Sequence, residues 1–353
     1  MPRVLPPLDP RGVDPAAPNP LAGVGFFVDH DAKAYRAWRH LRRKGRRRAA
    51  DVLWRLAGQP KFAWFGRFTR PHMRKKIRTY IARARCAGTV PLMTVMRHQG
   101  KRCGNGYTGG GRREDARTRR WYRRFARAVG SRRVVIAFEP DSIGTLECLV
   151  PSRRDDRLRL LRYGVNRLSQ LPNATVYLEA GASDWEPARA TARKLRRIGI
   201  GKVRGFMVNV THFDWTVNNI RYGYEVSRRV GGKPFIVSTA YNGRGPVHLK
   251  AVIGGRHRRL NVWCNPRMRG LGPPPTASTG YPGVDAFMWI GRPGYSAGAC
   301  NGGPLPVGAW WLRRALMFSR YATDWLRPAP GTRHGLYGRH TPRQLGYCGP
   351  RCT

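Results

Sequence analysis

Residues 134–149 read VVIAFEPDSIGTLECL, and this stretch indicates both a fold and a site. Its first part, Val134–Phe138, is an apolar run of the length and β-branched character typical of a buried strand. Glu139 and Asp141 follow at once, although the whole chain holds only 19 acidic residues. Because core packing does not select carboxylates, we interpret this strand end as a candidate catalytic position. The alternative is that Glu139 pairs with a nearby Arg.

The same succession of a short apolar run and an amphipathic segment repeats along the chain. Strands are predicted at 89–96, 134–138, 175–178, 203–210, 234–239 and 286–290. Helices are predicted at 73–87, 113–129, 157–168, 187–197, 223–230 and 309–321. This alternation is typical of βαβ units around a parallel sheet. We therefore expect an α/β fold, a single-domain, distorted (β/α) TIM-like barrel that is closed or nearly closed.

Polar residues also follow other predicted strands. Glu179 comes directly after 175–178, Asn209 follows 205–208, and Tyr241 and Asn242 follow 235–239. Barrels of this class place their chemistry at the carboxyl ends of the strands. We expect these side chains to lie at the same end of the barrel as Asp141.

The whole chain divides into a Pro-rich N-terminal lead-in (1–18), the expected barrel (19–325) and a C-terminal tail (326–353). The first 20 residues contain no apolar core of a signal peptide. No stretch approaches the roughly 18 uncharged apolar residues that a membrane span needs, so we expect no membrane span.

The net charge of +48 comes from 67 Lys and Arg residues. A content of 41% hydrophobic residues with 11 Trp excludes a disordered basic tail. The densest basic run, 42–48, lies between apolar residues at helical spacing in 33–57, and indicates either a solvated helix face or turn, or a polyanion patch. No zinc module or helix-turn-helix spacing is visible, so specific nucleic-acid binding is only an alternative.

The seven cysteines form no CxxC pair, and no His lies at zinc-like spacing, so we expect no metal. Either some of them form disulfides in an oxidising compartment, or all are reduced. Cys348 and Cys352 are close enough in sequence to close a small ring, and Cys86 is then a free thiol.

Further motifs occur in order along the chain. They are NPLAGVGFFVD (19–29), GQPKFAWFG (58–66), VYLEAGASDW (176–185), VRGFMVNVTHFDWT (203–216), FIVSTAYNGRGP (235–246), WCNPRMRGLGPPPT (263–276) and DAFMWIGRPGYSAGACNGGPLPVGAWW (285–311). Together with 134–149 they resemble glycoside hydrolase family 6, the inverting cellulases and cellobiohydrolases. The resemblance covers about residues 19 to 325 and implies a distorted barrel with an active-site tunnel or cleft.

The resemblance also implies roles for individual residues. Asp141 matches the general acid of an inverting mechanism, and Glu139 would place a like charge beside it that favours the protonated acid. Sugar-platform positions match Trp64, Trp185 and Trp263. Substrate contacts are expected at Glu179, Asn209, Arg102 and Tyr295. The family's disulfides match the pairs Cys103–Cys148 and Cys264–Cys300.

Several positions depart from the family pattern. Arg102, preceded by Lys101, stands where the family has an Asp that assists the acid. In the last motif Gly291 replaces a Lys, Tyr295 a Glu, and Ala297 the Asp usually assigned as base. Two substrate-contacting positions, a family Asp and a family His, are Glu179 and Ala182 here. The acid is therefore retained while the assisting Asp and the family's base are not.

Two functions follow from these residues. The first is a glycosidase that hydrolyses O-glycosyl bonds of a β-1,4-glucan-like or acidic polysaccharide, with Glu179 or Asp184 supplying the base. The second is a catalytically impaired relative that binds cell-wall or acidic polysaccharide. In either case we expect a monomer without cofactor, secreted or associated with the cell wall by family resemblance.

Overall fold

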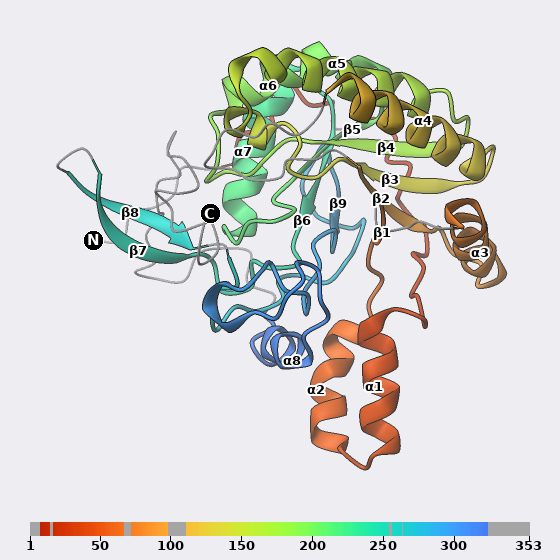
Figure 1. Ribbon diagram of the computed structural model, residues 1–353, viewed down its shortest axis with the longest axis vertical. Helices are drawn as coiled ribbons and strands as arrows, with labels where there is room; N and C mark the ends of the chain where they lie inside the picture. The colour runs from red at the N-terminus through yellow and green to blue at the C-terminus, as the bar shows by residue number, and fades with distance from the viewer. Residues whose placement is uncertain are drawn as a thin grey trace.

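A computed structural model describes residues 8–14, 17–66, 72–97, 111–253, 256–262 and 264–323. Its main feature is a sheet of seven parallel strands in the order β1-β2-β3-β4-β5-β6-β9 (Figure 1). The strands are β1 (Ala63–Gly66), β2 (Leu92–Met96), β3 (Val134–Phe138), β4 (Ala174–Glu179), β5 (Gly205–Val208), β6 (Phe235–Ser238) and β9 (Val284–Met288). Six of them were predicted from the sequence, and the α/β architecture is confirmed.

The sheet curls into a half-barrel whose edge strands are β1 and β9. No ladder joins these two strands in the described residues. Two bonds nevertheless cross between their ends: Phe62 N–H donates to the Trp289 carbonyl at 3.2 Å, and the indole N–H of Trp64 donates to the Ile290 carbonyl at 2.9 Å. The sheet is therefore a half-barrel and not the closed barrel that the sequence suggested, and only single hydrogen bonds join β1 to β9 in the described residues.

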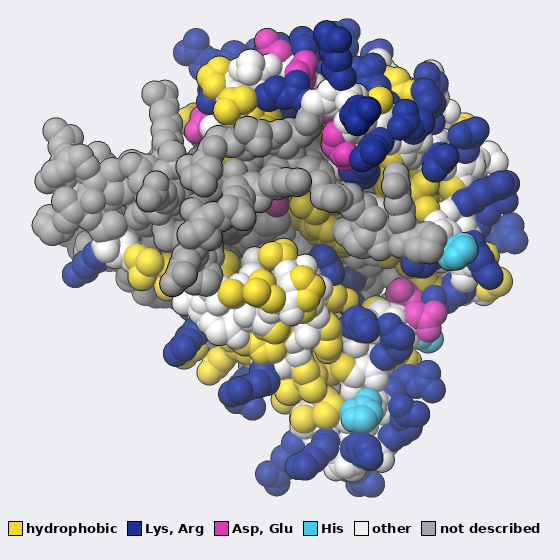
Figure 2. Space-filling view, viewed as in Figure 1, with side chains coloured by type: hydrophobic (Ala, Val, Ile, Leu, Met, Phe, Trp, Pro, Cys, Tyr) yellow, Lys and Arg dark blue, Asp and Glu magenta, His cyan; other side chains and the backbone are white. Residues whose placement is uncertain are grey.

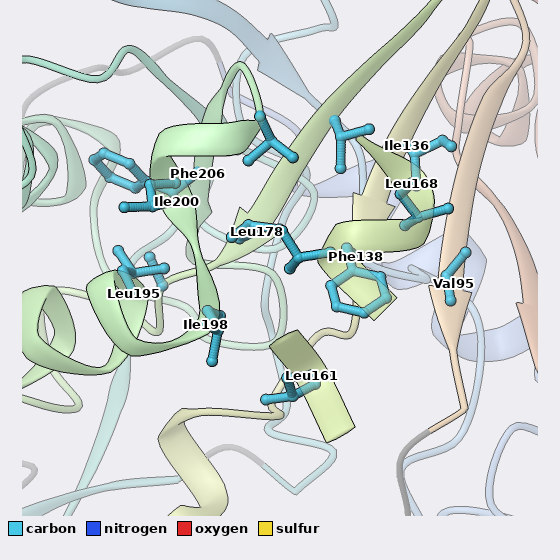
Figure 3. Packing of buried hydrophobic residues seen from close by; sticks show 14 of the residues in the cluster. Val95, Ile136, Phe138, Leu161, Leu168, Leu178, Leu195, Ile198, Ile200 and Phe206 are labelled. Carbon is cyan, nitrogen blue, oxygen red and sulfur yellow. The ribbon is translucent and has the colours of Figure 1, made fainter. Parts of the chain in front are cut away.

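Alternate residues of each strand face opposite sides, as the pleat requires. In β3, Val134, Ile136 and Phe138 pack toward the helices, whereas Val135 and Ala137 face the barrel interior. Figure 3 shows Ile136 and Phe138 among side chains of α5 and α6. Both faces are apolar, which explains why the strand is a continuous apolar run.

Helices α3 to α7 follow the strands and cover the outer face of the sheet (Figure 1). Their bounds are α3 (Met73–Cys86), α4 (Arg112–Val129), α5 (Pro151–Leu168), α6 (Ala188–Ile198) and α7 (Thr216–Arg229). The last helix, α8 (Leu312–Arg320), packs against the helix formed by Arg47–Ala57. Lys and Arg are spread over the visible surface of these helices (Figure 2). No described helix has both the length and the apolar composition that a bilayer crossing requires.

Two helices start earlier than the periodicity predicts. Helix α7 begins at Thr216, not near Gly223, because the buried amides of Asn218 and Asn219 are bound by Asp214 and backbone carbonyls. Helix α5 begins at Pro151, which suits a first helical position but precedes a charged run without apolar spacing.

Two hairpins extend from the barrel (Figure 1). The segment 33–57 forms α1 (Lys33–Arg43) and α2 (Arg47–Ala57), so the basic run spans the end of α1, the turn and the start of α2. The antiparallel pair β7 (Val247–Ile253) and β8 (Arg256–Val262) was not predicted. The opening motif 19–29 forms one isolated bridge, between Phe26 and Val90, and no longer strand.

A buried ion pair joins β4, β9 and the residue that precedes β5. Asp285 in β9 accepts two hydrogen bonds from the Arg204 guanidinium, both at 2.9 Å, and one from the Tyr177 hydroxyl at 2.5 Å. The carboxylate is almost fully buried. Replacing it would leave the guanidinium and the phenol without their acceptor.

We expect Asp285→Asn to lower the free energy of unfolding by about 3 kcal/mol, because one partner of a buried pair is lost. Urea denaturation measures this change. Asp155→Asn is the matched control, since Asp155 pairs with Arg197 on the surface and should cost less than about 1 kcal/mol. Equal losses in the two variants would contradict the structural role of Asp285.

Candidate active site

The end of β3 holds two carboxyl-bearing residues in left-handed backbone conformation. Glu139 has φ 55° and Asp141 has φ 67°. This conformation is uncommon for residues other than Gly and costs on the order of 1 kcal/mol each. Glu139 N–H donates to the Val95 carbonyl of β2 at 2.7 Å, which anchors the turn to the neighbouring strand. The turn projects Asp141 beyond the sheet, where it is only partly buried.

Glu139 is completely buried below this turn. Its two carboxylate oxygens accept the Arg97 N–H at 2.8 and 2.9 Å, and Oε1 also accepts the Tyr122 hydroxyl at 2.6 Å. These bonds connect the end of β3 to β2 and α4. Glu139 therefore supports the strand end from inside the protein, and a catalytic role for it stays a prediction.

Asp141 is held by the loop that follows β5. Its Oδ1 accepts a hydrogen bond from the Thr211 hydroxyl at 2.7 Å, while its main-chain carbonyl accepts Thr145 N–H at 3.0 Å. Thr211 directly follows the predicted strand 203–210 but was not singled out as a site residue. A hydroxyl just after a strand end in a barrel is the signal that would have found it.

Glu179, at the end of β4, is the second carboxyl of the site. It is 3% exposed, and it accepts the backbone N–H groups of Ile143 at 2.9 Å and Gly181 at 2.5 Å. Burial, together with the negative charge of nearby Asp141, raises the pKa of Glu179 to about 8 although both backbone N–H groups oppose the rise. The structure thus brings together the strand ends of β3 and β4, as expected.

A third carboxylate, Asp184, forms a buried cluster with His212. Asp184 Oδ1 lies 2.8 Å from His212 Nδ1, and Oδ2 accepts the Asn261 amide of β8 at 2.9 Å. Burial raises the pKa of Asp184, and the charge of His212 opposes this. The His212 ring stacks on the Trp185 indole at 4.5 Å and 16°, so this pair sets the orientation of the expected sugar platform. His212 was not predicted as a site residue.

Asn209 is buried at the end of β5 and has φ 65°. Its amide donates to the Ser238 carbonyl at 3.0 Å and to the Asp214 carbonyl at 3.3 Å. These bonds hold the loop that carries Thr211 and His212. Its role as a substrate contact stays a prediction.

Trp64 and Tyr295 lie at the seam between β1 and β9, where they line a pocket of about 540 Å³. Both side chains are half-buried. The Arg292 guanidinium lies 4.0 Å from the centre of the Tyr295 ring and 5.4 Å from that of Trp64. Ala297, further along the same loop, is exposed.

The remaining predicted site residues have different outcomes. The disulfide Cys264–Cys300 is present, and Cys86 is a free, exposed thiol. Arg102, Trp263 and the ring cysteines Cys348 and Cys352 lie outside the described residues, as does Cys103 of the expected pair Cys103–Cys148. No group of three His, Cys, Asp or Glu side chains in the described part of the chain has metal-binding geometry.

Residues 21–317 match the sequence profile described as glycosyl hydrolases family 6. This match covers most of the chain. The chain belongs to glycosyl hydrolases family 6. The family 6 resemblance of the strand-end motifs is thereby confirmed.

Individual family 6 proteins agree with this assignment. Endoglucanase A of Cellulomonas fimi is 34% identical over 307 residues, which are 86% of this chain and 62% of that enzyme. Endoglucanase 1 of Streptomyces halstedii is 30% identical over 79% of this chain and 83% of its own length. The solved structure of the endoglucanase Cel6 from Mycobacterium tuberculosis superposes with a TM-score of 0.76 at 33% identity, covering 86% of this chain and 99% of that one.

Proposed function

We propose that this protein is a glycosidase that hydrolyses O-glycosyl bonds of a β-1,4-glucan-like polysaccharide with inversion, and that Asp141 is its general acid. The observation that carries the proposal is the arrangement of two carboxyl groups, Asp141 and Glu179, at the ends of adjacent strands. The names of the two curated relatives, both endoglucanases, support a glucan as substrate.

Burial and the nearby charge of Asp141 raise the pKa of Glu179 to about 8. As the general acid, Asp141 protonates the leaving oxygen as the glycosidic bond breaks. Thr211 holds the carboxyl in place for this transfer. Glu139 supports the strand end and acts as a positioning residue.

Inversion also needs a base that takes a proton from the attacking water. We assign this role to the ionised form of Glu179, acting through a second water. After the reaction the proton lies on Glu179 and Asp141 is ionised, so the number of protons on the pair is unchanged. Asp184 is the alternative base, although His212 and Asn261 already engage both of its oxygens.

A second candidate function is binding without efficient hydrolysis. It is favoured by residue 297, an exposed Ala where the family has the carboxylate usually assigned as base. In that case the aromatic side chains Trp64, Trp185 and Trp263 would bind a cell-wall or acidic polysaccharide, and loss of the base would cost about 10² to 10⁴ in rate.

Secretion of the protein, or its association with a cell wall, is proposed on the Cys264–Cys300 disulfide, which requires an oxidising compartment. We also propose that it acts as a monomer.

Hydrolysis is tested by incubating the full chain with soluble β-1,4-glucan and with carboxymethylated glucan and measuring new reducing ends. The inverting mechanism predicts that the first product seen by proton NMR has the α configuration. A β product would contradict inversion, and no product from either glucan would favour the binding function.

A further inference from the structure

The pocket between β1 and β9 has an unusual composition for a neutral sugar site. Its walls come from the loop before α1, the start of α1, β1, α3 and the loop after β9. The lining cations are Lys33, Arg36, Lys61, Lys76 and Arg292, and the lining carboxylates are Asp29 and Asp31. The pocket therefore holds aromatic walls, Trp64 and Tyr295, within a ring of mostly basic side chains.

The two carboxylates share one ion-pair partner that lies outside the pocket. Arg83 of α3 donates to Asp29 Oδ1 at 2.6 Å and to Asp31 Oδ2 at 2.5 Å. One oxygen of each carboxylate is thus engaged in an ion pair. The lining cations outnumber these carboxylates, so the pocket offers a neutral sugar more donors than charged acceptors.

Lys61 is also committed to the protein. Its ammonium donates to the carbonyls of Leu56, Ala57 and Gln59 at the end of α2. This lysine closes the floor of the pocket and stabilises the last turn of α2.

Four cations remain: Lys33, Arg36, Lys76 and Arg292. Within the described residues none of them forms an ion pair with a carboxylate. Lys and Arg side chains only donate hydrogen bonds, so a ligand that satisfies them must be rich in acceptors. A carboxylate or phosphate group on a sugar has this chemistry, and Arg binds either with two parallel hydrogen bonds.

Arg292 is the most rigidly held of the four. Its guanidinium lies against the rings of Tyr295 and Trp64, its Nη2 reaches the Gly308 carbonyl at 3.5 Å, and its backbone N–H donates to the Tyr241 hydroxyl at 2.5 Å. Contacts on several sides reduce the conformational entropy that the side chain would lose on binding an anion.

The adjoining helices add a long-range attraction. Residues 33–57, which form α1 and α2, contain ten Lys and Arg residues and one acid, Asp51. The start of α1 lines the pocket, whereas the basic run 42–48 lies at the opposite end of this hairpin. Such a field raises the local concentration of anions and is weakened by salt.

We propose that this pocket binds an anionic sugar unit, carrying a carboxylate or a phosphate, with Arg292 and Arg36 as the residues that select the negative charge. The proposal rests on the proposed function, since it names the class of polysaccharide that the active site would receive. The aromatic walls, Trp64 and Tyr295, contact the sugar ring, and the guanidinium groups bind its charged substituent.

Titration calorimetry of the full chain tests this proposal with three ligands: cellotetraose, cellotetraose oxidised at C6 to the uronic acid, and cellotetraose phosphorylated at C6. Every protein titrated carries the substitution Asp141→Asn, so that no ligand is hydrolysed during the measurement. We expect at least one anionic tetramer to bind about tenfold more tightly than the neutral one, because only the anionic group forms charge-assisted hydrogen bonds with the guanidinium groups. The tighter of the two identifies the anionic group.

Arg292→Gln should remove about tenfold of the affinity for the anionic ligand and change that for cellotetraose by less than about twofold. Arg127→Gln, on the exposed face of α4, removes the same charge away from the pocket and should have little effect. Arg36→Gln, at an exposed position of α1, replaces Arg292→Gln if that variant unfolds.

The proposal is overturned if the three ligands bind equally, if none binds, or if the pocket variants and Arg127→Gln have the same effect. Its failure is distinguishable from failure of the proposed function. Hydrolysis of neutral glucan without an anion preference refutes only the pocket, whereas an anion preference without hydrolysis by the wild-type protein refutes only the glycosidase.

Discussion

Asp141→Asn is expected to lower the rate of glucan hydrolysis by about 10² to 10⁴, because the variant lacks the proton that the leaving oxygen requires. Asn is the informative substitution here. Asp141 has φ 67°, a conformation that Asn adopts readily and Ala does not. The Asn carbonyl can also accept the Thr211 hydroxyl, which donates to Oδ1 in the wild-type protein. The fold and the loop contact should therefore persist.

The measurement is initial rate by reducing-end release, with the thermal unfolding midpoint recorded in parallel. Asp51→Asn, a change of the same chemistry at an exposed position of α2, is the control and should retain full activity. The general-acid role makes a second demand. On an aryl glycoside whose leaving group needs no proton, Asp141→Asn should lose much less rate. Full activity of Asp141→Asn on glucan would refute the assignment.

Glu179→Gln is expected to change how stability depends on pH. The pKa of Glu179 is raised from 4.5 to about 8 in the folded protein, so between these values the folded state binds more protons than the unfolded state. Stability then falls as pH rises, by a contribution on the order of 3 kcal/mol across the window. Gln cannot ionise and removes this contribution, although it also loses one acceptor for a backbone N–H group.

Urea denaturation at pH 5 and pH 8 gives the free energy of unfolding of wild type and of Glu179→Gln. The effect is the change, between the two pH values, in the difference between these free energies. Relative to wild type, Glu179→Gln should gain stability as the pH is raised, whatever its absolute stability. Glu147→Gln is the control, since Glu147 is exposed in the 3₁₀ turn Gly144–Cys148. If the difference in free energy of unfolding between wild type and Glu179→Gln stayed constant from pH 5 to pH 8, the pKa of Glu179 would not be raised by folding.

Much of the barrel could be predicted from local sequence. Strands such as 134–138 are apolar on both faces because helices cover one side and the barrel interior the other, and this leaves a continuous apolar run to detect. The hairpin 247–262 escaped detection because its alternation includes many basic residues. The early start of α7 escaped because buried Asn side chains interrupt the apolar spacing.

The site divides in the same way. Asp141 and Glu179 were recognised because carboxylates follow apolar strands, and their adjacency follows from parallel pairing of β3 with β4. The contacts of His212 with Asp184 and Trp185 join the loops after β5 and β4, and no local pattern reports such a contact.

Amino-acid order alone determined the α/β class, the strand ends that carry the carboxyl groups and the family to which the chain belongs, because these depend on periodicity and on local motifs. Tertiary structure decided what each polar group can do. Burial raised the pKa of Glu179, and hydrogen bonds hold Glu139 below the strand end. Arg83 pairs with both carboxylates of the pocket, and Arg292 has no carboxylate partner in the described residues. These properties depend on solvent exclusion and on distances between residues far apart in sequence, which exist only once the chain has folded.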